Sequence, residues 1–97
     1  MESALIYRNK KLLETLRELP CMNCGQIDGT VCAAHRNQGK GMGMKVSDAL
    51  CAAMCHRCHS ELDNGNSYSR DERRDCWNQA YIKTMQYLIE NEYLKLK

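Results

Sequence analysis

Cys55-His56-Arg57-Cys58-His59 and the earlier Cys21-Met22-Asn23-Cys24 are the segments that decide the fold of this chain. Each segment places two cysteines three positions apart, and thirty residues separate the two pairs. Two such pairs are typical of a tetrahedral zinc ion bound by four thiolates, with no coordination position left open. We therefore predict a structural zinc site that clamps two distant parts of the chain and contributes folding energy. Its ligands would be Cys21, Cys24, Cys55 and Cys58.

Length and cysteine content bound the class of protein. The chain has 97 residues, the size of one domain. A chain this short often needs a disulfide or a bound metal to stabilise it in addition to its hydrophobic core. Its seven cysteines are an odd number, which excludes complete disulfide pairing within the chain. No signal-peptide pattern and no apolar run long enough to cross a membrane is present, so we expect a cytoplasmic protein. Cysteines there more often bind metal than pair, although disulfides stay an open alternative.

Apolar spacing divides the first part of the chain into elements. Leucines at helical intervals predict a helix from Ser3 to Leu19, which Pro20 ends. Short runs of small apolar residues predict strands at 30–34 and 49–54, although such runs are ambiguous between strand and helix. The glycine-rich segment from Arg36 to Ser47 predicts a flexible loop between them. Three remaining cysteines are interpreted as small buried hydrophobes, namely Cys32, Cys51 and Cys76.

Two further helices are expected after the second cysteine pair. A short one over 58–63 would be capped at Asn64-Gly65. A long one over about 70–90 would begin at the capping box formed by Ser69 and Glu72. One stripe of this long helix is predicted to face the core, and it consists of Trp77, Ala80, Tyr81, Thr84 and Leu88.

The order strand, loop, strand, cysteine pair and short helix resembles the ββα-metal fold, also called the His-Me finger or HNH nuclease fold. The matching part runs from Cys21 to Asp63, and it includes Ala34-His35-Arg36, Ser47-Asp48-Ala49-Leu50 and Cys55-x-x-Cys58-His59. The chain is similar to HNH endonucleases of the four-cysteine zinc type, among them small prophage-encoded nucleases of the YbcO type. The resemblance implies one α+β domain, with a zinc-stabilised ββα-metal core at about 21–63 and flanking N- and C-terminal helices.

The resemblance also implies roles for individual residues. In that family the histidine that ends the first strand is the general base, which corresponds to His35. The histidine directly after the last cysteine helps bind a catalytic Mg²⁺ or Mn²⁺, which corresponds to His59. Asp63 lies one helical turn later on the same face and occupies the place of a further ligand. The implied activity is hydrolysis of phosphodiester bonds in DNA, in which His35 activates water and the metal stabilises the transition state.

The chain departs from the family pattern at two positions. Many members have an aspartate before the base histidine as a further metal ligand, and this chain has Ala34. The middle asparagine of the family name is absent from its usual spacing, and Asp48 lies close to that place. We expect Asp48 to hold the loop and orient His35. These departures concern the shell of the catalytic metal more than the fold.

A non-catalytic zinc-binding module that docks nucleic acid or a protein partner would show the same cysteines. Considered singly, His35 could be an ordinary histidine, His59 an alternative zinc ligand and Asp63 a residue of a helix surface. His56 is expected to be exposed. The segment Gly39–Gly43 is not a P-loop, because it lacks the required spacing and the Lys-Ser/Thr pair. A general-base histidine beside a binding site for a divalent metal with a free coordination position would distinguish the nuclease from the binding module. Separately, the long C-terminal helix could pair with a second copy of itself, so a homodimer is possible.

The net charge of the chain is only +2, but positive charge gathers around the candidate site. Between Val31 and Ser60, Asp48 is the sole acidic residue. The basic residues of this segment are Arg36, Lys40, Lys45 and Arg57. We expect them to contact the phosphates of nucleic acid with little base readout, although solvated surface lysines would give the same pattern.

Neutralising Lys40 and Lys45 together should weaken DNA binding to a similar degree for all sequences, because phosphate contacts do not read bases. The slope of log affinity against log salt concentration should also become shallower, since fewer counterions are released. Titrations at several salt concentrations measure both effects. An unchanged slope would show that these lysines are merely solvated.

Overall fold

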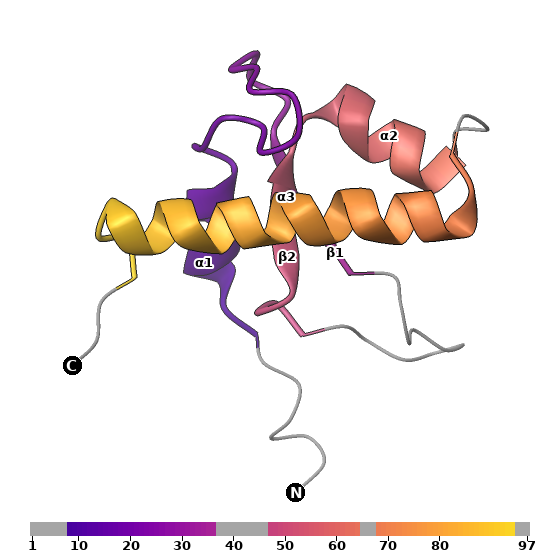
Figure 1. The fold of residues 1–97 in the computed structure, drawn as a ribbon. Helices are drawn as coiled ribbons and strands as arrows, with labels where there is room; N and C mark the ends of the chain where they lie inside the picture. Colours follow the sequence, from indigo (N-terminus) through magenta and orange to yellow (C-terminus); the bar gives the residue numbers. More distant parts are fainter. Residues whose placement is uncertain (1–7, 37–46, 65–67, 95–97) are drawn as a thin grey trace, which may run out of the picture.

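The computed structural model describes residues 8–36, 47–64 and 68–94, without the side chains of residues 63 and 64. Within these ranges the elements follow in the order α1 (Lys10–Leu16), β1 (Cys32–His35), β2 (Cys51–Met54), α2 (His56–Asn64) and α3 (Arg70–Glu90) (Figure 1). They form a small α+β fold, as predicted. The glycine-rich segment predicted as a loop, and Gly65 of the predicted helix cap, fall outside the described residues.

β1 and β2 form a two-stranded antiparallel sheet in which Cys32 lies opposite Met54 and His35 lies opposite Cys51. Both predicted strands are present, at 32–35 instead of 30–34 and at 51–54 instead of 49–54, so the ambiguity between strand and helix is resolved as strand. All four residues of β2 are buried. Because the middle positions of both strands are alanines, neighbouring helices can approach the sheet closely.

α3 packs across β2, and α1 packs against both strands (Figure 1). The Trp77 indole donates a hydrogen bond to the Ala34 carbonyl of β1 at 2.9 Å. The Thr84 hydroxyl accepts the Ala53 N–H of β2 at 3.0 Å and donates to the Ala80 carbonyl at 2.7 Å. Polar side chains of α3 therefore bond the backbones of both strands, in addition to burying apolar surface.

The capping box of α3 is confirmed, because Ser69 and Glu72 exchange hydrogen bonds between side chain and backbone. The predicted core stripe is also confirmed at Trp77, Ala80, Thr84 and Leu88, which are all buried. Tyr81 is half-buried and stacks on Trp77 with ring centroids 5.0 Å apart, while its hydroxyl donates to the Ala49 carbonyl at 2.9 Å.

Within the described residues, α1 begins later and ends earlier than predicted. It begins at Lys10, because Asn9 is extended and caps the helix by accepting the Leu12 N–H at 3.0 Å. After Leu16 the backbone hydrogen bonds join residues three positions apart instead of four. One of them runs from the Leu19 N–H to the Leu16 carbonyl at 3.2 Å. Positions 3–7 of the predicted helix lie outside the described residues.

α2 begins at His56, two residues earlier than predicted. The Thr30 hydroxyl accepts the His56 N–H at 3.0 Å and so satisfies a donor of the first turn. Thr30 is itself held by the Asp28 carboxylate at 2.7 Å. None of the helices in the described ranges combines the length and the apolarity needed to cross a membrane.

Thr84→Val should lower the free energy of unfolding by about 1–3 kcal/mol, because the buried Ala53 N–H loses its acceptor. Thr84→Ser keeps the hydroxyl and loses a methyl group, so its cost should be about 1 kcal/mol. Chemical denaturation of both variants beside the wild type measures the difference. Equal stability of Thr84→Val and the wild type would show that this hydrogen bond does not hold α3 to β2.

Candidate functional site

The sulfur atoms of Cys21, Cys24, Cys55 and Cys58 all lie within 4.8 Å of one another. Ligands about 2.3 Å from a tetrahedral zinc are about 3.8 Å apart, and the sulfurs of Cys24 and Cys55 are 3.7 Å apart. Each of the seven cysteines is a free thiol, so the disulfide alternative is not realised. The two cysteine pairs therefore form a four-cysteine cluster that is positioned to bind one metal ion, as a structural zinc requires.

The backbone of the first cysteine pair directs N–H groups at the Cys21 sulfur, which stabilises its thiolate form. Gly25 adopts a φ of 83° and donates its N–H to the Cys21 carbonyl at 2.8 Å, which closes the turn. The N–H groups of Asn23 and Cys24 then point at the Cys21 sulfur, each at 3.4 Å. Burial opposes ionisation of Cys21, but these N–H groups and that of Cys55 outweigh it and lower its pKa to about 6.

The second cysteine pair differs in its electrostatics. Burial raises the pKa of both thiols, that of Cys58 to about 12. These two sulfurs therefore need the positive charge of a bound metal to lose their protons at neutral pH. Such coupling between metal binding and deprotonation is expected of a site that adds metal-binding energy to the folding free energy.

Asn23 links the four-cysteine cluster to α3, a contact that the sequence analysis missed. Its amide nitrogen donates to the Cys58 sulfur at 3.2 Å, and its amide oxygen accepts from the Cys76 thiol at 3.4 Å. Cys76 was predicted to be a small buried hydrophobe, but it is half-buried and hydrogen-bonded. An asparagine between the two cysteines of the first pair could have indicated a hydrogen bond to sulfur, although the sequence does not show which sulfur accepts it.

At the far end of the hairpin, His35 Nε2 lies 3.0 Å from Asp48 Oδ1. Asp48 is only 4 % exposed, yet its pKa is lowered, because hydrogen bonds from His35, Asn9 and Arg8 outweigh the effect of burial. A carboxylate can only accept, so Nε2 of His35 carries the proton of this bond. In the neutral imidazole Nδ1 is then free to accept a proton, and the His35 side chain is 35 % exposed.

Arg8 and Asn9 hold Asp48 from the other side. Arg8 donates to Asp48 Oδ1 at 2.9 Å, and the Asn9 backbone N–H donates to Asp48 Oδ2 at 2.8 Å. Both carboxylate oxygens are therefore engaged before any ligand arrives. Sequence analysis missed both partners, because nothing in the local pattern links residues 39 and 40 positions away from Asp48.

Cys51 lies beside this pair, and the ligand atoms of His35, Asp48 and Cys51 are within 4.8 Å of one another. A second metal site here is disfavoured, because the Arg8 guanidinium already supplies positive charge to Asp48. Burial and the Asp48 charge also raise the pKa of Cys51 to about 12, which keeps the thiol neutral. The arrangement fits a histidine oriented by a carboxylate better than a metal centre.

His59 lies on the first turn of α2, where its N–H bonds the Cys55 carbonyl at 2.9 Å. Its ring nitrogen Nδ1 is 3.5 Å from the Cys32 sulfur. Among the described residues, no group of three metal-ligand side chains contains His59, so His35 and His59 do not share such a group. The side chain of Asp63, its predicted co-ligand, is outside the described atoms.

Two of the four predicted phosphate-contacting residues are described. Arg57 is exposed, and its hydrogen bond to Cys24 raises the pKa of the guanidinium. Arg36 is half-buried, and its Nε atom is buried without a hydrogen-bond partner in the described part of the chain. Lys40 and Lys45 fall outside the described residues. His56 is exposed, as predicted.

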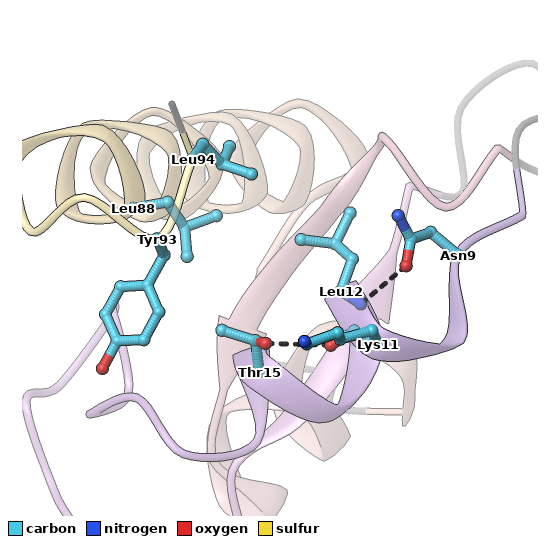
Figure 2. Close-up of a pocket in the computed structure, with 7 residues that line it drawn as sticks. All are labelled: Asn9, Lys11, Leu12, Thr15, Leu88, Tyr93 and Leu94. Carbon is cyan, nitrogen blue, oxygen red and sulfur yellow. Dashed lines mark hydrogen bonds between the residues drawn. The ribbon is translucent and has the colours of Figure 1, made fainter. Parts of the chain in front are cut away.

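A cavity of about 170 Å³ lies on a different part of the molecule, between α1 and the end of α3 (Figure 2). It is lined by Asn9, Lys11, Leu12, Thr15, Leu88, Tyr93 and Leu94. This lining contains no histidine, cysteine or carboxylate. The polar contacts drawn there close the first turns of α1, with Leu12 N–H bonded to Asn9 and Thr15 bonded to the Lys11 carbonyl. The cavity therefore contributes no chemistry to the candidate site.

Comparison with known proteins supports the fold. No protein-family model and no curated protein matches the chain. A solved structure described as "a putative bacteriophage protein" from Escherichia coli str. K-12 substr. MG1655 is similar, with a TM-score of 0.55. The match covers 81 % of this chain and 89 % of that one, at 16 % sequence identity. At this identity the comparison shows a shared fold, and it says nothing about activity.

Cys24→Ser should lose bound zinc and melt at a lower temperature, because metal-binding energy contributes to folding energy at such a site. A strong chelator should have the same effect on the wild type. Cys76→Ser is the matched control: it lies outside the four-cysteine cluster and keeps a hydroxyl beside Asn23, so its zinc content should be unchanged. Elemental analysis and thermal melting measure both. Wild-type protein without zinc after chelator-free purification would refute the assignment.

Proposed function

We propose that this chain is a metal-dependent endonuclease of the HNH type that hydrolyses phosphodiester bonds of DNA. The observation that carries the proposal is the hydrogen bond between His35 and the buried Asp48 at the end of β1. A half-exposed imidazole with one nitrogen fixed by a buried carboxylate is the arrangement expected of a general base. In this proposal the β1–β2 hairpin and α2 form a ββα-metal core, with the four-cysteine cluster as its structural zinc site.

The proton transfer follows from the hydrogen bonds of His35. Asp48 accepts the proton of Nε2–H, so the lone pair of Nδ1 takes a proton from the attacking water. The imidazolium that forms is stabilised by the Asp48 carboxylate 3.0 Å away. Arg8 and Asn9 keep this carboxylate ionised and fixed, so it need not move during the reaction.

His59 and Asp63 would hold the catalytic divalent metal in this proposal. A bound Mg²⁺ or Mn²⁺ supplies stabilisation of negative charge on the phosphate and on the leaving oxygen. The donor set fits such an ion, because a carboxylate with an imidazole and waters suits it better than thiolates do. His59 is half-buried, and its Nδ1 lies 3.5 Å from the Cys32 sulfur.

The similar solved structure is described as a bacteriophage protein, and we extend a phage or prophage origin to this chain as part of the proposal. The shared fold supports this extension. Phosphate contacts by Arg57, Lys40 and Lys45 would hold DNA near His35. Arg57 is exposed, as such a contact requires.

A non-catalytic zinc-binding module that docks nucleic acid or a protein is the second candidate. One observation favours it: His35 and His59 belong to no common ligand group among the described residues. The four-cysteine cluster and the exposed Arg57 would serve such a module equally well. Cleavage activity distinguishes the two candidates.

His35→Ala should reduce plasmid nicking in the presence of Mn²⁺ by about a hundredfold or more, the usual size of a general-base contribution. It should retain the zinc and the fold, because His35 is outside the four-cysteine cluster. His56→Ala is the matched control, since it removes an exposed histidine from the same domain and should nick like the wild type. Equal nicking by wild type and His35→Ala would indicate a contaminant or a different base. Absence of nicking across metals and DNA forms would favour the binding module.

Three further variants divide the mechanism into its parts. Asp48→Asn should lower the rate while leaving Mn²⁺ affinity unchanged, because Asp48 orients the base. His59→Ala should lose activity through the metal, and excess Mn²⁺ should partly restore it. Asp63→Ala should behave in the same way but more weakly, if water replaces its oxygen. Failure of excess Mn²⁺ to restore any His59→Ala activity would remove His59 from the metal shell.

A further inference from the structure

Asp48 lies in a short turn that precedes β2, from Ser47 to Leu50. The Leu50 N–H bonds the Ser47 carbonyl at 3.0 Å, and the Ser47 hydroxyl accepts the Ala49 N–H at 3.1 Å. The Arg36 N–H joins the turn to the end of β1 by bonding the Leu50 carbonyl at 2.9 Å. These bonds fix the shape of the turn and one of its edges, and none of them uses the Ala49 carbonyl.

The Ala49 carbonyl is bonded by α3 instead. It accepts a hydrogen bond from the Tyr81 hydroxyl at 2.9 Å, and the direction is fixed because a carbonyl oxygen cannot donate. The Tyr81 ring stacks on Trp77 one helical turn earlier, with centroids 5.0 Å apart and planes 10° from parallel. Trp77 is itself held, since it is 8 % exposed and its indole N–H bonds the Ala34 carbonyl. The hydroxyl therefore reaches the turn from a ring whose rotation is restricted.

The two carbonyls bonded by these aromatic side chains flank the candidate base and its carboxylate. Ala34 directly precedes His35 in β1, and Ala49 directly follows Asp48 in the turn. One pair of stacked rings on one helix thus holds the backbone beside both partners of the 3.0 Å contact between His35 Nε2 and Asp48 Oδ1. A hydrogen bond weakens steeply when its angle departs from linearity, so a displaced turn would weaken this contact.

We propose that Tyr81 is a positioning residue that holds the turn carrying Asp48 in place relative to His35. This inference rests on the proposed function, in which His35 is the general base. Arg8 and Asn9 hold the carboxylate group itself, whereas Tyr81 holds the backbone that carries it. The base and its carboxylate therefore depend on α3, although α3 contains none of the residues proposed for proton transfer.

Hydrogen exchange tests this role without metal or substrate. Tyr81→Phe removes the hydroxyl and keeps the ring that stacks on Trp77, so it isolates one hydrogen bond. The His35 Nε2–H proton and the Leu50 amide should exchange with water about threefold to tenfold faster, because loss of that bond makes local opening of the turn more frequent. Nuclear magnetic resonance of zinc-loaded protein, at a pH where the imidazole is neutral, measures both rates.

Tyr87→Phe is the matched control for the exchange measurement. It removes the hydroxyl from another half-buried tyrosine of α3, and it should leave both exchange rates as in the wild type. Unchanged exchange of the His35 proton in Tyr81→Phe would overturn the proposal, because the hydroxyl would then stabilise the fold without holding Asp48 against His35.

Nicking kinetics provide the second measurement. Tyr81→Phe should lower kcat by about threefold to tenfold and leave KM for DNA unchanged, since Tyr81 acts through the turn. In an Asp48→Ala background the same change should have little further effect, because the carboxylate that Tyr81 positions is already absent. Equal losses in both backgrounds would overturn the proposal. A wild type that does not nick, together with faster His35 proton exchange in Tyr81→Phe, would support the positioning by Tyr81 and overturn the proposed function.

Discussion

The remaining structure depends on one constraint: the four-cysteine cluster holds two distant segments of the chain together. One cysteine pair lies between α1 and β1, and the other spans the junction of β2 and α2. A single ion bound by all four sulfurs would fix where the hairpin begins and where α2 starts. The hairpin itself is built largely from alanines, which bury little apolar area each. Metal-binding energy would therefore carry a larger share of the folding free energy than in a domain with a larger core.

A second connection ties the opposite end of the hairpin to the start of α1. Asp48 binds His35, Arg8 and the Asn9 backbone at once. Asn9 also caps α1 through its side chain, so the helix start and the orientation of the imidazole share one residue. A substitution that unfolds the first turn of α1 would thus alter the orientation of His35 through Asp48, although neither α1 nor Asn9 contains a candidate catalytic group.

The sequence predicted features whose determinants lie within a few residues of one another. The paired cysteines, the Ser69–Glu72 capping box and the buried stripe of α3 all have fixed local spacing, and each is present. Prediction failed where a distant contact decided the outcome. Of the described residues in the helix predicted from Ser3, positions 8 and 9 are not helical and α1 starts at Lys10, because the Asn9 backbone N–H bonds Asp48. The polar contacts of Cys32 were missed for the same reason, since their partners Met54 and His59 are 22 and 27 positions away in the sequence.

Both ends of the connection between the strands are anchored independently of what lies between them. The Arg36 N–H bonds the Leu50 carbonyl at 2.9 Å, which extends the ladder beyond His35, and Asp48 holds the returning chain. Doubling the length of a closed loop costs only about 0.6 kcal/mol in closure entropy. Insertions and deletions between Arg36 and Ser47 should therefore be tolerated without displacing the histidine or its carboxylate. The sequence between Arg36 and Ser47 could then vary while the residues proposed for proton transfer stay where they are.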